Sequence, residues 1–214
     1  MPGPPTKIML IRHGEKPGKK KDRPPDAVNL DGVAGENSLI VQGWQRAGGL
    51  VALLAPQSGS FQNPALAQPS SIYASGTVTS KSLRPQETVA PLAKKLGITP
   101  NTNYNPSKEA GAPASVPHER EMVENVLQQP GVVLICWQHE LIPHIVSHIP
   151  LTQGTAYPKT WCPDRFDLVW VFDLNAASQA GSPQYDFTQV PQNLLAGDLN
   201  EPMQDPYPAK SNAT

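Results

Sequence analysis

The sequence predicts an α/β fold, a three-layer sandwich in which a mostly parallel central sheet is flanked by helices. Short apolar runs alternate along the chain with segments of helical periodicity, which is the order expected of strand–helix–strand units. One run, residues 132–137 (V-V-L-I-C-W), is apolar throughout, as in strands that are covered on both faces. The 214 residues suffice for one such domain with a full hydrophobic core.

The predicted strands are short apolar segments bounded by Pro, Gly or polar residues. They are residues 7–11, 71–75, 132–137 and 168–174. Residues 98–116 are predicted as a loop that holds one short strand near residues 102–104.

The predicted helices are residues 38–54, 84–96, 117–128 and 141–148. In the first of them, apolar residues recur at steps of three and four. The second has Pro85 in its first turn and is followed by Gly97, and these positions favour a helix start and a helix stop. The third begins Pro117-His118-Glu119, which assigns His118 to a helix start because acids in the first turn favour a helix N-terminus.

The composition argues against several classes of partner. Seventeen Lys and Arg against 18 Asp and Glu leave a net charge of −1, so binding to nucleic acid or to an anionic membrane is not expected. No apolar run is long enough for a membrane span, and the N-terminus resembles neither a signal nor a transit peptide. Cys136 and Cys162 are expected to be reduced thiols of a cytoplasmic protein. No pattern indicates an oligomeric state.

Proline is the outlier of the composition, with 25 residues in 214. This is more than twice the usual share of about 5% and predicts an ordered core with long, stiff loops. Residues 1–214 are predicted to form a single domain, with a mobile Pro-rich tail at about residues 198–214.

Chemically active residues follow three of the predicted strands. Ligands of parallel sheets bind beyond the carboxyl ends of the strands, so the residues after positions 11, 75 and 137 point to one crevice. They are Arg12-His13-Gly14-Glu15, Ser75-Gly76 and Gln138-His139-Glu140. Arg84 opens the helix that follows the second strand.

Two imidazoles and two guanidiniums in one crevice predict a phosphoryl site. Each of the guanidiniums of Arg12 and Arg84 offers paired donors that match phosphate oxygens. Positive charge lowers the pKa of a neighbouring histidine, which leaves a neutral imidazole nitrogen available as a nucleophile. The second histidine can donate to the phosphoryl oxygens as charge develops on them.

Residues 11–16 (I-R-H-G-E-K) resemble the R-H-G signature of the histidine phosphatase superfamily, which includes cofactor-dependent phosphoglycerate mutases and acid phosphatases. Three further segments agree with the family in order and spacing, over about residues 7–175. Gly43-x-x-Arg46-Ala47 is similar to the G-x-x-Q-A pattern of the family's first helix. R-P-Q-E-T at 84–88 is similar to its R-A-x-x-T helix start, and C-W-Q-H at 136–139 to the strand that carries its second histidine.

The resemblance implies a phosphoglycerate mutase-like fold and a role for each matching residue. His13 attacks phosphorus and carries a transient phosphohistidine, which water then hydrolyses. Arg12, Arg84 and His139 bind the phosphoryl oxygens.

A carboxylic acid is expected to protonate the leaving oxygen. Glu140 is favoured, because it follows the second histidine directly, where the acid-phosphatase branch usually has Asp. Glu109 and Glu119 are the alternatives, because the mutase branch takes its acid from that region. The mutase-type E-R-x-Y-G stretch is absent, which favours hydrolysis over mutase chemistry.

Other motifs are absent or incomplete. The chain has no G-x-x-x-x-G-K-[ST] loop, which excludes a P-loop NTPase. His139 and His144 do not make a zinc-protease motif, because they lie five residues apart with Pro143 between them. No metal site and no cofactor are predicted.

The sequence therefore predicts a metal-independent phosphatase for a small phosphorylated substrate, with a phosphohistidine on His13. The alternatives are a phosphomutase and a catalytically weak phospho-ligand-binding or scaffold protein on the same fold. The basic residues at 16–23 are predicted to form a solvated loop, or else to attract an anionic substrate. Residues 161–166 are predicted as a turn before the last strand, or else as a wall of the pocket.

Overall fold

A computed structural model describes residues 3–18, 26–107, 118–179 and 181–205. A five-stranded sheet in the order β2-β3-β1-β4-β5 forms its centre. The strands are β1 (Pro5–Arg12), β2 (Ser71–Ala74), β3 (Gly131–Trp137), β4 (Leu168–Leu174) and β5 (Tyr185–Pro191). The helices are α1 (Val41–Leu54), α2 (Arg84–Leu96), α3 (Glu119–Val126) and α4 (Ile142–Val146), with a 3₁₀ turn η2 (His139–Leu141) before α4.

The sheet is mixed rather than mostly parallel. β2, β3 and β1 pair in parallel, whereas β4 is antiparallel to β1 and β5 is antiparallel to β4. The path of the chain after β3 explains the difference. Leu151 bridges to Tyr185, which pairs with Leu174, the last residue of β4. By Leu151 the chain has therefore already run along the sheet to the end opposite the one where β3 stops. Residues 152–167 then return the chain to the first end of the sheet, so β4 starts where β1 and β3 stop.

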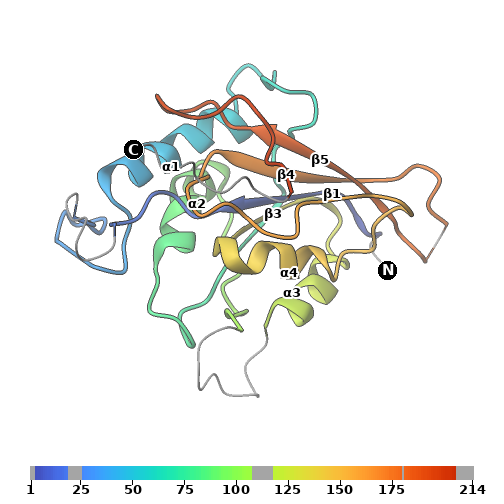
Figure 1. Ribbon diagram of the computed structural model, residues 1–214, viewed down its shortest axis with the longest axis horizontal. Helices are drawn as coiled ribbons and strands as arrows, with labels where there is room; N and C mark the ends of the chain where they lie inside the picture. The colour runs from blue at the N-terminus through green and yellow to red at the C-terminus, as the bar shows by residue number, and fades with distance from the viewer. Residues whose placement is uncertain (1–2, 19–25, 108–117, 180, 206–214) are drawn as a thin grey trace, which may run out of the picture.

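The two faces of the sheet carry separate hydrophobic cores. Ile8 and Leu10 of β1 pack into the core that α3 and α4 cover, and Met9 and Ile11 pack into the core that α1 and α2 cover. This alternation follows from the two-residue repeat of a strand. Figure 1 shows α3 and α4 together on one side of the strands and α1 on the other. Both faces of the central strands are therefore buried, as the apolar run at 132–137 predicts.

Most helix predictions are confirmed with small shifts at the ends. α2 has the predicted bounds, and Gly97 ends it in the left-handed conformation with φ 67°. α1 begins at Val41 and not at residue 38, because the backbone N–H groups of Leu39 and Ile40 donate to Glu87 and to the Glu15 carbonyl. Residues 102–104 form no strand, and Asn101 alone bridges to β2.

The C-terminal part of the chain is more ordered than its composition suggests. β5 was not predicted, because its Y-D-F-T-Q-V-P sequence has few apolar residues and it lies at the edge of the sheet. Residues 198–205, the start of the predicted tail, pack against the domain, and Met203 is buried in the core. Residues 206–214 lie outside the described residues.

Two further predictions concern the thiols and the membrane. Cys136 and Cys162 are free and buried, in the cores on opposite faces of the sheet. Among the described residues, no helix has the length and apolar character that crossing a membrane requires.

Candidate active site

The predicted site lies at one end of the sheet, along the line where strands stop or start. β1, β2 and β3 end there, and β4 begins there because it runs in the opposite direction. A cavity of about 630 Å³ opens at this end. Its lining comes from the ends of β1 and β3, the start of α2 and two loops: Arg12, Lys16, Pro17, Gly18, Glu36, Arg84, His139, Glu140, Pro163, Asp164 and Phe166. The structure thus gathers four of the five predicted site residues around one cavity.

Arg12, the last residue of β1, is 1% exposed. Its NH1 group donates to the carbonyls of Pro163 (2.5 Å) and Arg165 (3.1 Å), and its Cζ lies 3.5 Å from the ring centroid of Phe166. Its Nε is buried and has no hydrogen-bond partner within the described parts of the chain. Burial lowers the pKa of Arg12 to about 10, so the side chain still carries its charge at neutral pH. A buried cationic N–H without an acceptor is a favourable place for an anion.

His13 follows directly and is 2% exposed. Its Nδ1 lies 2.7 Å from the carbonyl of Gly14. A carbonyl oxygen only accepts, so Nδ1 carries the proton and Nε2 keeps the lone pair of the neutral ring. Burial, and after it the charge of Arg12, holds the pKa of His13 well below its usual value, so the ring is neutral in mild acid. His13 does not line the cavity itself, but its ring centroid lies 6.2 Å from that of Phe166, which does.

Close backbone packing holds the turn after His13. The N–H of Gly14 donates to Thr88 Oγ1 of α2 (2.8 Å), which in turn donates to the carbonyl of Arg84 (2.7 Å). On the other side, a Cβ on Gly43 of α1 would lie 2.5 Å from the carbonyl oxygen of Glu15. Glycine at position 43 therefore allows α1 to press directly against the turn that carries the predicted nucleophile.

Replacing Gly43 with Ala is expected to lower the free energy of unfolding by about 1–3 kcal/mol, the usual cost of overpacking. Any reaction that uses His13 should slow as well, because the backbone of residues 13–15 has to move. Gly48→Ala in the same helix is the matched control, because a Cβ there would meet nothing within 4 Å. That control should leave stability unchanged or raise it by about 0.5–1 kcal/mol in urea denaturation. Equal effects of the two substitutions would contradict the role of the contact.

Arg84 lies at the start of α2, where sequence analysis placed it, and Pro85 is tolerated in that first turn. Its NH2 donates to the carbonyl of Glu36 (2.5 Å) and its Nε to that of Ser38 (3.1 Å). Arg84 therefore lines the cavity and also fixes the loop before α1. Burial lowers its pKa from the usual arginine value.

His139 and Glu140 form a pair at the end of β3. The imidazole Nδ1 lies 3.0 Å from Glu140 Oε2, although the two groups do not align as a regular hydrogen bond. The neighbouring imidazole, with a smaller contribution from the charge of Lys16, lowers the pKa of Glu140 to about 2, although burial alone would raise it. Burial lowers the pKa of His139, and the charge of Arg12 adds to this effect, against the opposing influence of Glu140. In the ligand-free protein, Glu140 is therefore a carboxylate and His139 is mostly neutral near pH 7.

Of the other two candidate acids, the structure describes Glu119 alone, and Glu119 does not line the cavity. Glu119 is 1% exposed and lies at the start of α3, where its Oε1 accepts from Trp137 Nε1 (3.2 Å) and from the N–H of Ser107 (3.1 Å). Glu109 lies outside the described residues, as do the basic residues at 19–23. Of the two predicted acids that the structure describes, Glu140 lines the cavity and Glu119 does not.

Arg46 of α1 has a structural role in this site. The side chain is 2% exposed and donates to Glu15 through Nε (3.0 Å) and NH2 (2.7 Å). It also donates to Asp198 (2.7 Å) and to Gln192 (2.9 Å). One guanidinium thus ties the turn after His13 to α1 and to the segment that follows β5.

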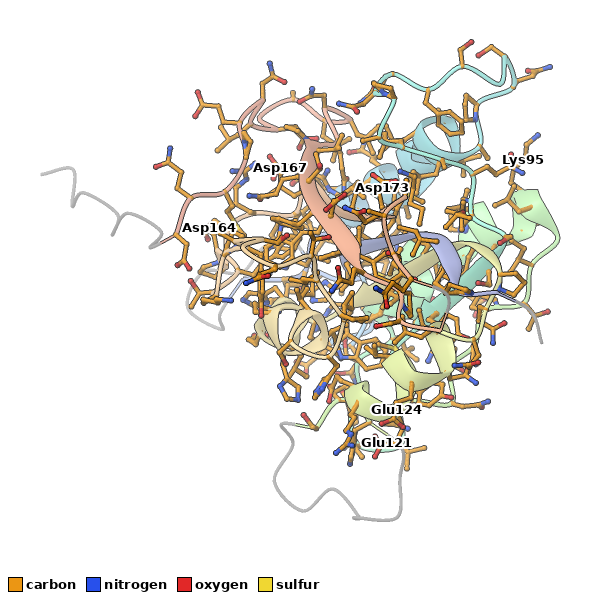
Figure 2. The ribbon with its side chains drawn as sticks, turned by 90° about the vertical axis from the view of Figure 1, so that its right-hand side faces the viewer. Lys95, Glu121, Glu124, Asp164, Asp167 and Asp173 are labelled. Carbon is orange, nitrogen blue, oxygen red and sulfur yellow. The ribbon has the colours of Figure 1, made fainter. Side chains whose placement is uncertain are left out.

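Sequence reasoning named Asp164 and Phe166 only within residues 161–166, as the alternative to a simple turn. Figure 2 shows Asp164 at the outer edge of the molecule and Asp167 closer to the sheet. The position of the 161–166 segment depends on the antiparallel direction of β4, which the sequence does not show. The alternative prediction of a pocket wall holds for Pro163, Asp164 and Phe166. Ser75 and Gly76 do not line the cavity, and Ser75 instead accepts from Gln86 and Gln138.

His144 of α4 and His148, which follows this helix, do not line the cavity. His144 Nε2 and His148 Nε2 are 3.4 Å apart. Within the described ranges, no group of three or more His, Cys, Asp or Glu side chains is arranged to hold a metal ion.

Comparison with known proteins yields matches among solved structures but none in sequence. No protein-family model matches the chain, and no curated protein matches it in sequence. The fold is similar to that of a protein described as the "putative phosphohistidine phosphatase SixA from Agrobacterium tumefaciens", with 13% identity and a TM-score of 0.39 over 79% of this chain and 92% of that one. At this level of similarity, the match says nothing about the activity of this chain.

Proposed function

We propose that this protein is a phosphatase that hydrolyses a small phosphomonoester, with His13 as the nucleophile. The state of His13 carries the proposal. Its Nδ1 is held by the Gly14 carbonyl at 2.7 Å, and its pKa is depressed by burial and by Arg12. The ring is thus a neutral base with one free lone pair, beside a buried guanidinium whose Nε has no acceptor within the described structure. This combination suits attack on a phosphoryl group.

Two transfers complete the proposed reaction. His13 Nε2 attacks phosphorus, the bond to the leaving oxygen breaks, and an acid protonates that oxygen. Water then attacks the phosphohistidine, gives its proton to the same carboxylate, and releases phosphate with a free His13. Arg12, Arg84 and His139 bind the phosphoryl oxygens in both steps. His13 lies beside the cavity, with its ring centroid 6.2 Å from that of the lining residue Phe166.

We favour Glu140 as the acid, because it lies at the cavity beside His139. The depressed pKa of its carboxyl group means that Glu140 enters the reaction as a carboxylate in most molecules at neutral pH. A bound phosphoryl dianion raises this pKa, because a nearby like charge disfavours the carboxylate. The protonated fraction grows tenfold for each unit by which the pH falls toward the pKa. The depressed pKa of His13 favours its neutral form as the pH falls, so acid-assisted turnover should increase in mild acid.

Glu140→Gln should therefore lower kcat/KM for the hydrolysis of alkyl phosphates about 10²-fold, in the range of general-acid catalysis. It should lower kcat/KM for aryl phosphates much less. An alkoxide needs a proton to leave, whereas a phenolate leaves without one. The variant should also lose the increase in alkyl-phosphate kcat/KM that the wild type shows below pH 6. The measurement is kcat/KM for one alkyl and one aryl ester across pH 4–9. Glu124→Gln, an exposed residue on α3 (Figure 2), is the control and should resemble the wild type. If kcat/KM falls equally for both esters, Glu140 is not the general acid, and Glu109, Glu119 or another group protonates the leaving oxygen.

The proposed chemistry requires no metal ion, because Arg12, Lys16 and Arg84 line the cavity and supply positive charge. The direct test is hydrolysis of an aryl phosphate in the presence of a chelator. Undiminished activity supports the proposal, and activity that disappears with the chelator contradicts metal independence. We further propose that the protein acts in the cytoplasm as a single domain. A phosphomutase or a phospho-ligand-binding scaffold on the same fold remains the second hypothesis if wild-type protein hydrolyses no ester.

A further inference from the structure

We propose that Phe166 is a positioning residue for Arg12. Its ring and the carbonyls of Pro163 and Arg165 hold the guanidinium so that the Nε edge is left for the phosphoryl group. This inference rests on the proposed function, because it assumes that the cavity binds a phosphoryl group. Phe166 belongs to no motif of the sequence, and it reaches the cavity only because β4 starts at this end of the sheet.

The hydrogen bonds of Arg12 define which edge is free. A guanidinium can grip a phosphate with two parallel bonds along its NH1–NH2 edge or along its Nε–NH2 edge. Here NH1 already donates to two backbone carbonyls, at 2.5 Å and 3.1 Å. Nε is buried and lacks a partner among the residues that the structure describes. The Nε–NH2 edge therefore remains for the anion.

The Phe166 ring holds the plane of this guanidinium. Arg12 Cζ lies 3.5 Å from the ring centroid, which is a stacking distance. The two hydrogen bonds of NH1 hold that nitrogen in place. The flat ring opposes any tilt of the guanidinium plane that would move Nε and NH2. Nε lies in a part of the site that is closed to water, since Arg12 is 1% exposed. An aliphatic side chain of similar bulk could exclude water but would offer no flat, electron-rich face.

The segment that carries Phe166 is fixed before any ligand binds. The carbonyl of Arg165 accepts from Trp161 Nε1 (2.8 Å) as well as from Arg12, and the side chain of Arg165 donates to Asp167 (2.6 Å) and to the carbonyl of Glu201 (2.7 Å). Trp161 is buried in the core below. Residues 163–166 are thus a preformed support, and its ordering does not reduce the affinity for the anion.

The test measures the affinity of inorganic phosphate by calorimetry in wild type and in Phe166→Leu. Loss of the stacked face should weaken phosphate binding about tenfold, within the range of a desolvated cation–π contact. With an aryl phosphate, KM should increase more than kcat decreases, because Arg12 holds the phosphoryl group in the ground state as well as in the transition state. Phe166→Tyr keeps the ring and should restore affinity to within about threefold of wild type. Phe61→Leu makes the same substitution in a partly buried residue of the opposite core and should leave phosphate binding unchanged.

Three outcomes would overturn the inference. Equal phosphate affinity in wild type and Phe166→Leu would remove the role of the ring and leave the proposed function intact. Equal losses in the Leu and Tyr variants would show that the residue acts by shape and not by its aromatic face. No phosphate binding by wild type would overturn the phosphoryl site itself, and the inference with it. Thermal unfolding confirms that each variant is folded, and Phe166→Met replaces the Leu variant if that one is not.

Discussion

His13→Ala is expected to lower kcat/KM for an aryl phosphate by about 10⁴-fold or more, the scale seen when a nucleophile is removed. The cavity, Arg12 and Arg84 remain, so substrate binding should change far less than turnover. The effect should be the same with and without a chelator. Steady-state kinetics at pH 5 and pH 7 measure it, because the depressed pKa of His13 keeps the wild-type ring neutral at both values.

Two variants separate lost chemistry from lost structure. His13→Asn can still donate to the Gly14 carbonyl, as Nδ1 does at 2.7 Å, but it has no lone pair in place of Nε2. It should fold like wild type and be as inactive as His13→Ala. His144→Ala, on α4 and outside the cavity lining, should retain full activity. An Asn variant that hydrolyses the ester at more than a few per cent of the wild-type rate would contradict nucleophilic catalysis by His13.

Arg46→Met is expected to give the largest loss of stability, about 3–5 kcal/mol, the usual cost of breaking a buried ion pair from one side. The side chain of Arg46 is 2% exposed, and those of Glu15 and Asp198 are 10% and 6% exposed. Removing the guanidinium would leave two nearly buried carboxylates without their cation. They would have to take up protons, draw in water or move apart, and each of these outcomes costs free energy.

Urea denaturation followed by circular dichroism measures this loss as a shift of the midpoint. Arg120→Met is the matched control, because Arg120 pairs with Glu124 at 3.1 Å but both side chains are more than half exposed. An exposed pair four residues apart on a helix contributes about 0.5 kcal/mol or less. Similar midpoints for the two variants would mean that the Arg46 network does not hold the turn after His13. If the account is correct, Arg46→Met should also lose activity, although it touches no substrate.

The parts of the fold that sequence reasoning predicted are those encoded locally. β3 is an unbroken apolar run, and α2 has Pro85 at its start and Gly97 at its end, so both were placed almost to the residue. The direction of β4 is not encoded in its own residues. It follows from the bridge of Leu151 to Tyr185, a contact distant in sequence. β5 lacks a clear apolar pattern because it lies at the edge of the sheet.

In the candidate site too, residues placed by local sequence patterns were predicted, and those placed by contacts distant in sequence were not. Arg12, Arg84, His139 and Glu140 follow strand ends or open a helix, and parallel pairing of β1, β2 and β3 brings those ends together. Phe166 depends on the reversed β4 and could not be placed from sequence. The pairing of His139 with Glu140 could be anticipated from their adjacency. The low pKa of Glu140 depends on the close approach of the imidazole and, to a smaller extent, on the position of Lys16, which together outweigh the effect of burial.

Trapping the phosphoenzyme tests the central claim most directly. Glu140→Gln is suited to it, because an aryl phosphate can phosphorylate His13 without an acid, whereas hydrolysis of the phosphohistidine would lack its base. Enzyme incubated with a phosphorus-labelled aryl phosphate is quenched in alkali, digested and mapped. The account predicts label on the peptide that contains His13, stable in alkali and lost in acid, with none in His13→Asn. Label that survives acid and is lost in alkali, or turnover without label on His13 in both wild type and Glu140→Gln, would contradict it.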